Sequence, residues 1–211
     1  MKFSTYLFDF DYTLVNSEKG IVDCFRHIFE KYNHTGISDE VIRRTIGMTL
    51  QDAFTSMTGI TDADTLELYR RDYVKKSDEI MNPNTKFYPD SIEAMRRLKE
   101  SGCVTGIIST KYRYRIQAFL TDTDTEDLFD IIVGGDDVCN AKPDPQGINQ
   151  AVSRLGCSKS DTVYIGDNII DAMAAHNAGV NFIAVTTGTN TAEEFSLYDC
   201  VSIMTCLSEL I

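Results

Sequence analysis

The fold follows from nine residues near the start of the chain, Tyr6-Leu7-Phe8-Asp9-Phe10-Asp11-Tyr12-Thr13-Leu14. The first of them form a short apolar run, which predicts a buried strand over about residues 4–10. The run leads to the carboxylates of Asp9 and Asp11 and then to the hydroxyl of Thr13. Acids at the end of a buried strand are costly unless a cation or hydrogen-bond donors compensate them. The pattern therefore predicts a hard metal ion such as Mg2+, a nucleophilic carboxylate and a second acid for proton transfer. A strand end with two solvated acids is the simpler interpretation, and this stretch alone leaves both open.

Strand and helix patterns alternate along most of the remaining chain. Apolar runs predict further strands at 103–110, 128–133, 161–165, 181–185 and 201–204, and helical spacing is found at 91–101, 114–120, 148–155 and 170–178. This alternation predicts an α/β fold, a Rossmann-like parallel sheet with helices on both faces. Between residues 17 and 82 the pattern is helical throughout. We therefore expect an all-helical domain, residues 16–82, inserted into an α/β core domain of residues 1–15 and 83–211.

Polar side chains follow the predicted strands where each strand ends. Ser109 and Thr110 follow the second strand, Lys142 comes after the third in Ala-Lys-Pro-Asp-Pro, and Asp167 and Asp171 follow the fourth. In open parallel sheets, ligands bind beyond the carboxyl ends of the strands. We therefore expect these side chains to meet the acids of the first strand at one sheet edge. Taken singly, each has a simpler interpretation as a helix cap, a solvated loop lysine or an acid at a helix start.

In order, Asp-x-Asp-x-Thr, Ser-Thr, Lys-Pro and Gly-Asp-x-x-x-Asp resemble the four motifs of the haloacid dehalogenase-like (HAD) superfamily of aspartyl-phosphate phosphatases. The resemblance implies a Rossmann-like core, a helical cap inserted after the first motif, and Mg2+ as cofactor. It implies that Asp9 is the nucleophile, that Asp11 is the general acid and base, and that Lys142 contacts the phosphoryl group. The implied substrate- or phosphate-binding residues are Thr13, Ser109, Thr110 and Lys111, and the implied metal-binding residues are Asp9, Asp11, Asp167 and Asp171.

Further matches favour one branch of the superfamily. Phe-Asp-x-Asp-x-Thr-Leu-x-x-Ser, Ile-Gly-x-x-Leu and Ser-Thr-Lys are similar to phosphoglycolate phosphatases. Two positions depart from that branch: Tyr12 replaces a glycine common after the second acid, and Asn16 replaces a frequent acid. Asp11 disfavours a dehalogenase, which lacks the second acid. Gly166 in the fourth motif, with His27 as the only histidine of the first predicted cap helix, disfavours a β-phosphoglucomutase.

These patterns lead to one expected function and several alternatives. We expect a Mg2+-dependent phosphatase that hydrolyses a small-molecule phosphate monoester, phosphoglycolate-like, through an aspartyl-phosphate. A pyrophosphatase, sugar-phosphatase or phosphomutase of the same superfamily is the alternative, followed by a receiver-like phospho-aspartate switch and an inactive binding module. In the predicted cap, Arg43 or Arg44 could pair with a substrate carboxylate, or both could be solvated helix residues.

The composition of the chain disfavours several classes of binding partner. A net charge of -12 argues against nucleic acid and anionic membranes. No apolar run approaches the roughly 20 residues that span a bilayer, and no signal-peptide pattern precedes the first strand. Six scattered cysteines without a Cys-x-x-Cys motif favour free thiols over a zinc site. We expect a cytoplasmic monomer or homodimer that binds a small phosphorylated metabolite.

Overall fold

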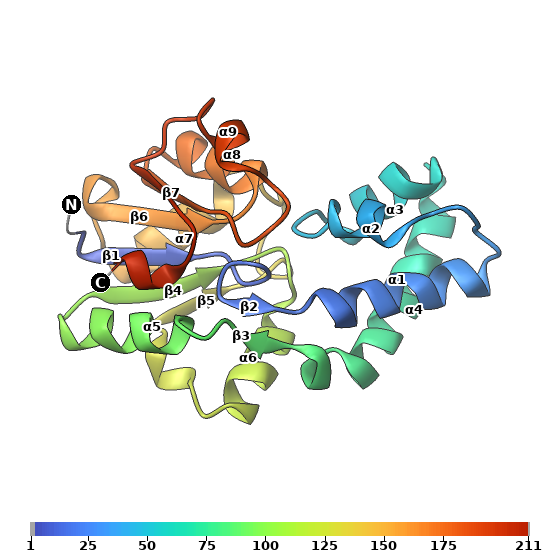
Figure 1. The fold of residues 1–211 in the computed structure, drawn as a ribbon, viewed down its shortest axis with the longest axis horizontal. Coiled ribbons are helices and arrows are strands. Elements are labelled where there is room, and N and C mark those ends of the chain that lie inside the picture. Colours follow the sequence, from blue (N-terminus) through green and yellow to red (C-terminus); the bar gives the residue numbers. More distant parts are fainter. Residues whose placement is uncertain (1–2, 211) are drawn as a thin grey trace. The chain divides into compact units, whose positions relative to one another are not determined.

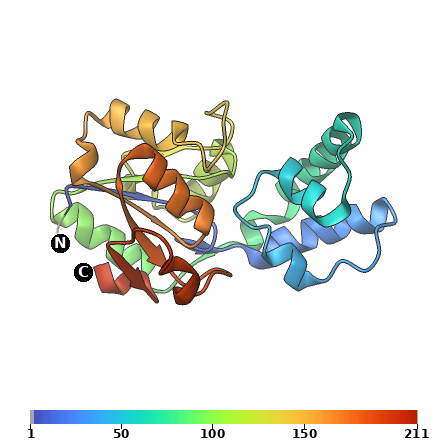
Figure 2. The same cartoon turned by 90° about the horizontal axis from the view of Figure 1, so that it is seen from above.

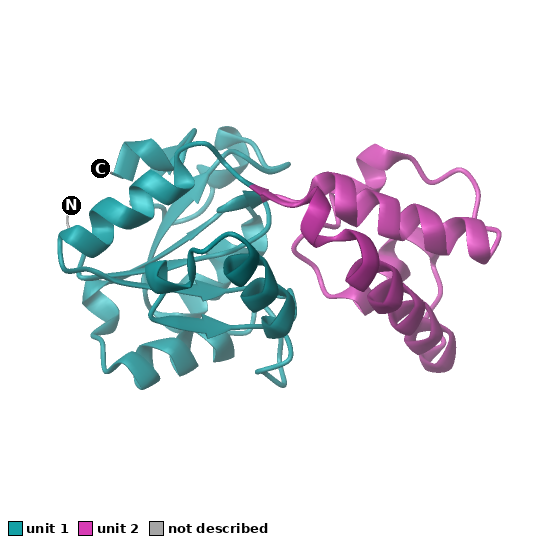
Figure 3. Cartoon of the chain, turned by 90° about the horizontal axis from the view of Figure 1, so that it is seen from below, with its two compact units in different colours: residues 1–15, 87–211 teal, residues 16–86 magenta. Residues whose placement is uncertain are grey.

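The computed structural model describes residues 3–210 and divides the chain into two compact units. Unit 1 comprises Met1–Val15 and Phe87–Ile211, and unit 2 comprises Asn16–Lys86 (Figure 3). The sequence pattern ends the inserted segment at residue 82, four residues before the end of unit 2. A short 3-10 helix, η1 (Asn82–Asn84), packs against the helices of unit 2, which is why these residues belong to it.

Unit 1 is built on a six-stranded parallel sheet with the strand order β5-β4-β1-β6-β7-β8 (Figure 1). Its strands are β1 (Thr5–Phe8), β4 (Val104–Ile108), β5 (Ile131–Val133), β6 (Thr162–Gly166), β7 (Asn181–Val185) and β8 (Ser202–Met204). The register pairs Phe8 of β1 with Ile107 of β4 and Ile165 of β6. Because these three central strands end side by side, the residues that follow them share one edge of the sheet.

The first strand is shorter than its apolar residues suggest. The sequence pattern extends it to residue 10, but β1 ends at Phe8. The Phe10 carbonyl accepts hydrogen bonds from the N–H groups of Leu14 at 3.0 Å and Val15 at 3.1 Å, which closes a turn directly after the strand. Asp9 lies between the strand and this turn, and Asp11 lies within the turn.

Helices cover both faces of the sheet, as Figure 2 shows. They are α5 (Ser91–Glu100), α6 (Arg113–Asp122), α7 (Gln146–Leu155) and α8 (Ile169–Ala178), followed by the short α9 (Ala192–Phe195). Tyr6 and Phe8 face a core shared with α5 and α6, whereas Leu7 between them faces a core shared with α7 and α8. The described part of this unit also contains the 3-10 helices η2 (Glu126–Leu128), η3 (Lys159–Asp161) and η4 (Leu207–Leu210). The two-residue alternation of a strand therefore builds two separate cores.

Unit 2 is helical, with α1 (Glu18–Lys31), α2 (Asp39–Arg43), α3 (Leu50–Thr58) and α4 (Ala63–Ile80). An aromatic cluster holds these helices together: the Phe25 ring lies 5.1 Å from Phe54 and 4.8 Å from Tyr73, between ring centroids. Helices α2, α3 and α4 begin at side-chain caps, each worth about 1 kcal/mol. Two short strands, β2 (Val15–Asn16) and β3 (Lys86–Phe87), pair where the chain passes between the units.

A search of the described residues finds no helix with the length and apolar character needed to cross a membrane.

Candidate active site

Asp9 and Asp11 lie just after the end of β1. The N–H of Asp9 donates to the Ile165 carbonyl of β6 at 2.8 Å, which fixes the first acid at the sheet edge. Only 2% of Asp9 and 9% of Asp11 is exposed. Both carboxylates are therefore buried and need compensating charge or donors.

Three buried carboxylates meet at this edge. Asp9, Asp167 and Asp171 each offer one oxygen, and these oxygens lie within 4.8 Å of one another. The Thr13 hydroxyl donates to Asp167 Oδ1 at 3.0 Å. Burial, with the negative charges of Asp171 and Asp9, raises the pKa of Asp167 well above its usual range. Burial also raises the pKa of Asp9 to about 6, against the opposing effect of a nearby lysine.

That lysine is Lys142, which lies between two of the acids. Its Nζ donates to Asp9 Oδ1 at 2.8 Å, to Asp171 Oδ1 at 2.6 Å and to the Tyr164 hydroxyl oxygen at 3.1 Å. Burial alone would lower the pKa of Lys142, but Asp171 and Asp9 raise it well above 10.5, so the ammonium stays charged. One positive charge faces three buried acids, including Asp167. A divalent cation with oxygen ligands fits this imbalance.

Asp11 is paired separately from this cluster. Lys111 Nζ donates to Asp11 Oδ1 at 2.5 Å, and both side chains are about nine-tenths buried. The same ammonium lies 5.4 Å from the centroid of the Phe10 ring. The sequence pattern suggests Lys111 as a substrate-binding residue and Asp11 as a metal-binding one; the structure places each against the other.

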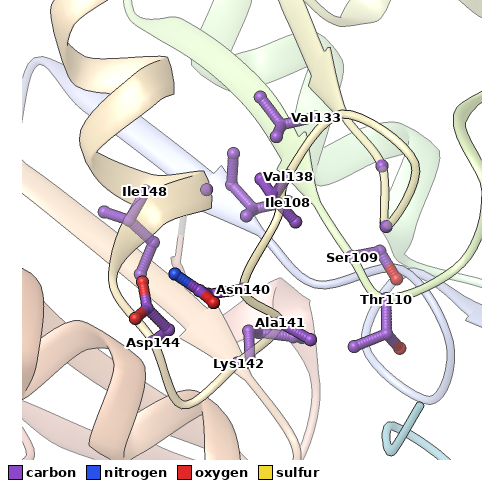
Figure 4. Close-up of a pocket in the computed structure, with 13 residues that line it drawn as sticks. Ile108, Ser109, Thr110, Val133, Val138, Asn140, Ala141, Lys142, Asp144 and Ile148 are labelled. Carbon is purple, nitrogen blue, oxygen red and sulfur yellow. The ribbon is translucent and has the colours of Figure 1, made fainter. Parts of the chain in front are cut away.

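A pocket adjoins the cluster, lined in part by the loops that follow β4 and β5. Figure 4 shows Ser109 and Thr110 on one side of it and Asn140 and Asp144 on the other. Apolar residues of β4, β5 and α7 complete the lining. The two loops touch closely, because a Cβ atom on Gly135 would lie 2.3 Å from the Thr110 carbonyl oxygen. The pocket thus offers hydroxyl donors on one wall beside the acidic cluster.

Comparison with known proteins identifies the family. The family model for haloacid dehalogenase-like hydrolases matches residues 6–185. The chain belongs to the haloacid dehalogenase-like hydrolases. The family and the α/β fold expected from the four motifs are thereby confirmed.

Individual relatives of this hydrolase span nearly its whole length. Pyrophosphatase PpaX of Bacillus velezensis is 31% identical over 205 residues, which cover 97% of this chain and 93% of that protein. The crystal structure of a proposed haloacid dehalogenase-like hydrolase from Bacteroides fragilis is 50% identical, with a TM-score of 0.98 and full coverage of both chains. A proposed phosphoglycolate phosphatase from Lactobacillus plantarum is 19% identical, with a TM-score of 0.89, and covers 100% of this chain and 98% of that one. The last likeness shows the fold alone.

Tyr12 stands where the resemblance to phosphoglycolate phosphatases leads us to expect a glycine. Its backbone is left-handed, with a φ of 61°. An L side chain in this region costs roughly 1–2 kcal/mol, which explains the preference for glycine. Here the Tyr12 N–H donates to the Val15 carbonyl at 2.8 Å, and the Thr187 hydroxyl donates to the Tyr12 carbonyl. These contacts on both sides of the residue stabilise the strained turn.

The sequence of this hydrolase does not predict two residues that the structure places at the site, Tyr164 and Gly188. Tyr164 lies in an apolar strand, so its pattern is that of a core residue, yet its hydroxyl contacts Lys142. Gly188 follows β7 in a short loop, and a Cβ atom there would lie 2.0 Å from Asp167 Oδ2. Asp171 is predicted from its motif, but the structure gives it two roles. Its Oδ1 accepts a hydrogen bond from Lys142, and its Oδ2 accepts the Asn168 N–H at 3.1 Å and so caps α8.

The two arginines that the sequence offers as candidates for a substrate carboxylate, Arg43 and Arg44, form ion pairs within unit 2. Arg43 donates from Nε to Glu18 Oε1 at 2.7 Å, and Arg44 donates from Nε to Glu40 Oε1 at 3.1 Å. Any contact of either arginine with a substrate carboxylate would compete with these ion pairs.

Proposed function

We propose that this protein is a Mg2+-dependent phosphatase that hydrolyses a small phosphorylated metabolite through an aspartyl-phosphate on Asp9. The observation that carries the proposal is the contact of Lys142 with Asp9 inside a cluster of three buried acids. A buried carboxylate that faces a charged lysine and a candidate cation site is suited to attack an anionic phosphoryl group, because the positive charges offset the repulsion between anions.

The donor set fits a magnesium ion. Asp9 and Asp167 would hold it with carboxylate oxygens and Asp11 with its backbone carbonyl, while Asp171 supports them. Burial and the charges of Asp171 and Asp9 raise the pKa of Asp167, and a bound cation would favour its ionised form. When bound, Mg2+ would neutralise charge on the phosphoryl oxygens.

The remaining chemistry would belong to side chains of this chain. Lys142 holds Asp9 through Oδ1, which leaves Oδ2 to attack phosphorus. As the new P–O bond forms, the bond to the leaving oxygen breaks, and Asp11 would give that oxygen a proton. Asp11 would then take a proton from the water that hydrolyses the aspartyl-phosphate and releases phosphate. Ser109 and Thr110 would donate hydrogen bonds to the phosphoryl oxygens.

Two substrates are candidates. The sequence motifs favour a phosphoglycolate-like monoester. The 31% identity to a protein named pyrophosphatase PpaX favours pyrophosphate. Both compounds are small and carry a second anionic group, so each would need local positive charge in a protein whose net charge is -12. That net charge also argues against nucleic acid and anionic membranes as partners. A small metabolite as the partner, and a monomer or homodimer as the assembly, stay predictions.

Phosphate release tests this proposal. The assay compares 2-phosphoglycolate, pyrophosphate, hexose phosphates and p-nitrophenyl phosphate, with Mg2+ and with EDTA, for the wild type and Asp9→Asn. Asp124→Asn is the matched control, because Asp124 is an exposed acid of unit 1 outside the site. We expect release that needs Mg2+, disappears in Asp9→Asn and persists in Asp124→Asn; the highest kcat/KM would name the substrate. A well-folded wild type that releases phosphate from none of these compounds would contradict the proposal.

A further inference from the structure

Tyr164 is a buried titratable residue to which the reaction described above gives no task. It lies on β6 with 0% of its surface exposed, in the core shared with α7 and α8. Its hydroxyl reaches the carbonyl of Ile108, the last residue of β4, at 2.8 Å. Because β1 lies between β4 and β6 in the sheet, the side chain spans the end of the strand that delivers the nucleophile. It thereby links the strands that precede the second and fourth motifs.

The available donors and acceptors determine which partner donates in each hydrogen bond of the Tyr164 hydroxyl. A phenol has one proton to donate and an oxygen that can accept, whereas an ammonium can only donate. Two acceptors lie near the Tyr164 hydroxyl, the Ile108 carbonyl at 2.8 Å and Asp171 Oδ1 at 3.2 Å. The shorter contact takes the proton, so the phenol oxygen accepts from Lys142 Nζ at 3.1 Å. A phenol is neutral at neutral pH, so Tyr164 keeps its proton and donates it.

The ammonium of Lys142 has three N–H groups and three acceptors. Two acceptors, Asp9 and Asp171, carry charge, and the third is the neutral oxygen of Tyr164. Without the third, the ammonium would be tied to the two carboxylates alone and could rotate about the line that joins them. A phenol anchored to the end of β4 removes that freedom, because its own position is set by the sheet.

We propose that Tyr164 is a positioning residue that holds Lys142 against Asp9 in the orientation the reaction needs. The role of Lys142 in that reaction rests on the proposed function, but the restraint on its ammonium does not. Loss of the hydroxyl would let Lys142 shift, and the attacking carboxylate would shift with it. The hydroxyls of Ser109 and Thr110 would stay in place to bind substrate. The cost therefore falls on turnover more than on substrate binding.

Kinetics of Tyr164→Phe test this assignment, with Tyr6→Phe as the matched control. Tyr6 is a buried strand tyrosine on the opposite face of the sheet, and its hydroxyl oxygen accepts a hydrogen bond from the Phe3 N–H at 3.2 Å. We expect kcat to fall about tenfold in Tyr164→Phe with KM within twofold, the size of one hydrogen bond to a charged group. We expect Tyr6→Phe to keep both constants, and 4-aminophenylalanine at position 164, which can donate and accept, to restore kcat. A Tyr164→Phe enzyme with unchanged kcat would overturn the inference.

NMR of the ammonium group tests the same assignment without turnover. In 15N-lysine-labelled protein, the Lys142 resonance is assigned by its loss in Lys142→Met. We expect its N–H protons to exchange about tenfold faster in Tyr164→Phe and at an unchanged rate in Tyr6→Phe. In the wild type, a nuclear Overhauser contact should join these protons to the Tyr164 hydroxyl proton, a measurement that does not require the variant to fold. Absence of that contact, or equal exchange rates, would overturn the inference even if the protein hydrolyses phosphate; Asp9→Asn separately tests the proposed function.

Discussion

Burial of Asp9 should make the metal-free protein less stable as the pH rises from about 4 to about 6. Burial raises the pKa of Asp9 from 3.8 to about 6, with Lys142 opposing the rise and Asp171 adding to it. In the unfolded chain this carboxyl titrates near its ordinary value of about 3.9. Between the two values the folded protein keeps a proton that the unfolded chain has released. Because the folded state then binds more protons, the free energy of unfolding falls as the pH rises through this window and levels off above it.

The size of the effect follows from the same shift. A rise in pKa from 3.8 to about 6 corresponds to a loss of about 3 kcal/mol in the free energy of unfolding, at about 1.36 kcal/mol for each pH unit. Asp9→Asn removes the titration and keeps the shape of the side chain. Urea denaturation in EDTA at several pH values should therefore show the variant gaining about 3 kcal/mol over the wild type between pH 4 and pH 7.

Magnesium and a control variant complete this experiment. The cation should favour the ionised form of Asp9, so Mg2+ at 100 times its dissociation constant should restore about 2.7 kcal/mol to the wild type at pH 7 and much less to Asp9→Asn. Asp124→Asn should follow the wild type at every pH. A difference between Asp9→Asn and wild type that stays constant from pH 4 to pH 7 would refute the reasoning from burial.

Two further substitutions probe the charge balance and the space around the cluster. Lys142→Met leaves Asp9 and Asp171 buried without the lysine that pairs with both. We expect the free energy of unfolding, measured with urea at pH 7 in EDTA, to fall by about 3–5 kcal/mol. An unchanged free energy of unfolding would contradict the ion pairing. Gly188→Ala places a methyl group 2.0 Å from Asp167 Oδ2, so the carboxylate must move. We expect the affinity for Mg2+, measured by calorimetry, to fall about 10–100-fold. A variant that binds Mg2+ as tightly as the wild type would count against Asp167 as a ligand.

The fold was predictable because local patterns and one general rule of topology agree. Alternation of apolar strands and helices indicates a parallel sheet, and such sheets bind ligands at the carboxyl ends of their strands. Asp9 lies at the end of a predicted strand, and Lys142, Asp167 and Asp171 each follow one. The structure brings these four side chains together. Their proximity was predictable although they are up to 162 residues apart in sequence.

Contacts that depend on strand register were not predictable. Tyr164 lies in an apolar strand and has the pattern of a core residue. Nothing in the neighbouring sequence shows that its hydroxyl passes the end of β1 to reach the Ile108 carbonyl. The pairing of Lys111 with Asp11 joins residues 100 apart and depends on how two loops meet. The end of β1 was misplaced by two residues because Phe10 is apolar and buried whether it lies in the strand or in the turn.

The most direct test of the central claim is to trap the phosphorylated enzyme. The wild type is mixed with its best substrate and Mg2+, quenched in acid within milliseconds, reduced with borohydride and digested for mass spectrometry. We expect homoserine in place of aspartate at position 9, which marks an acyl phosphate there, and none after the same treatment with EDTA or in Asp9→Asn. Turnover without a trapped group at Asp9, or with the group on another residue, would contradict the mechanism.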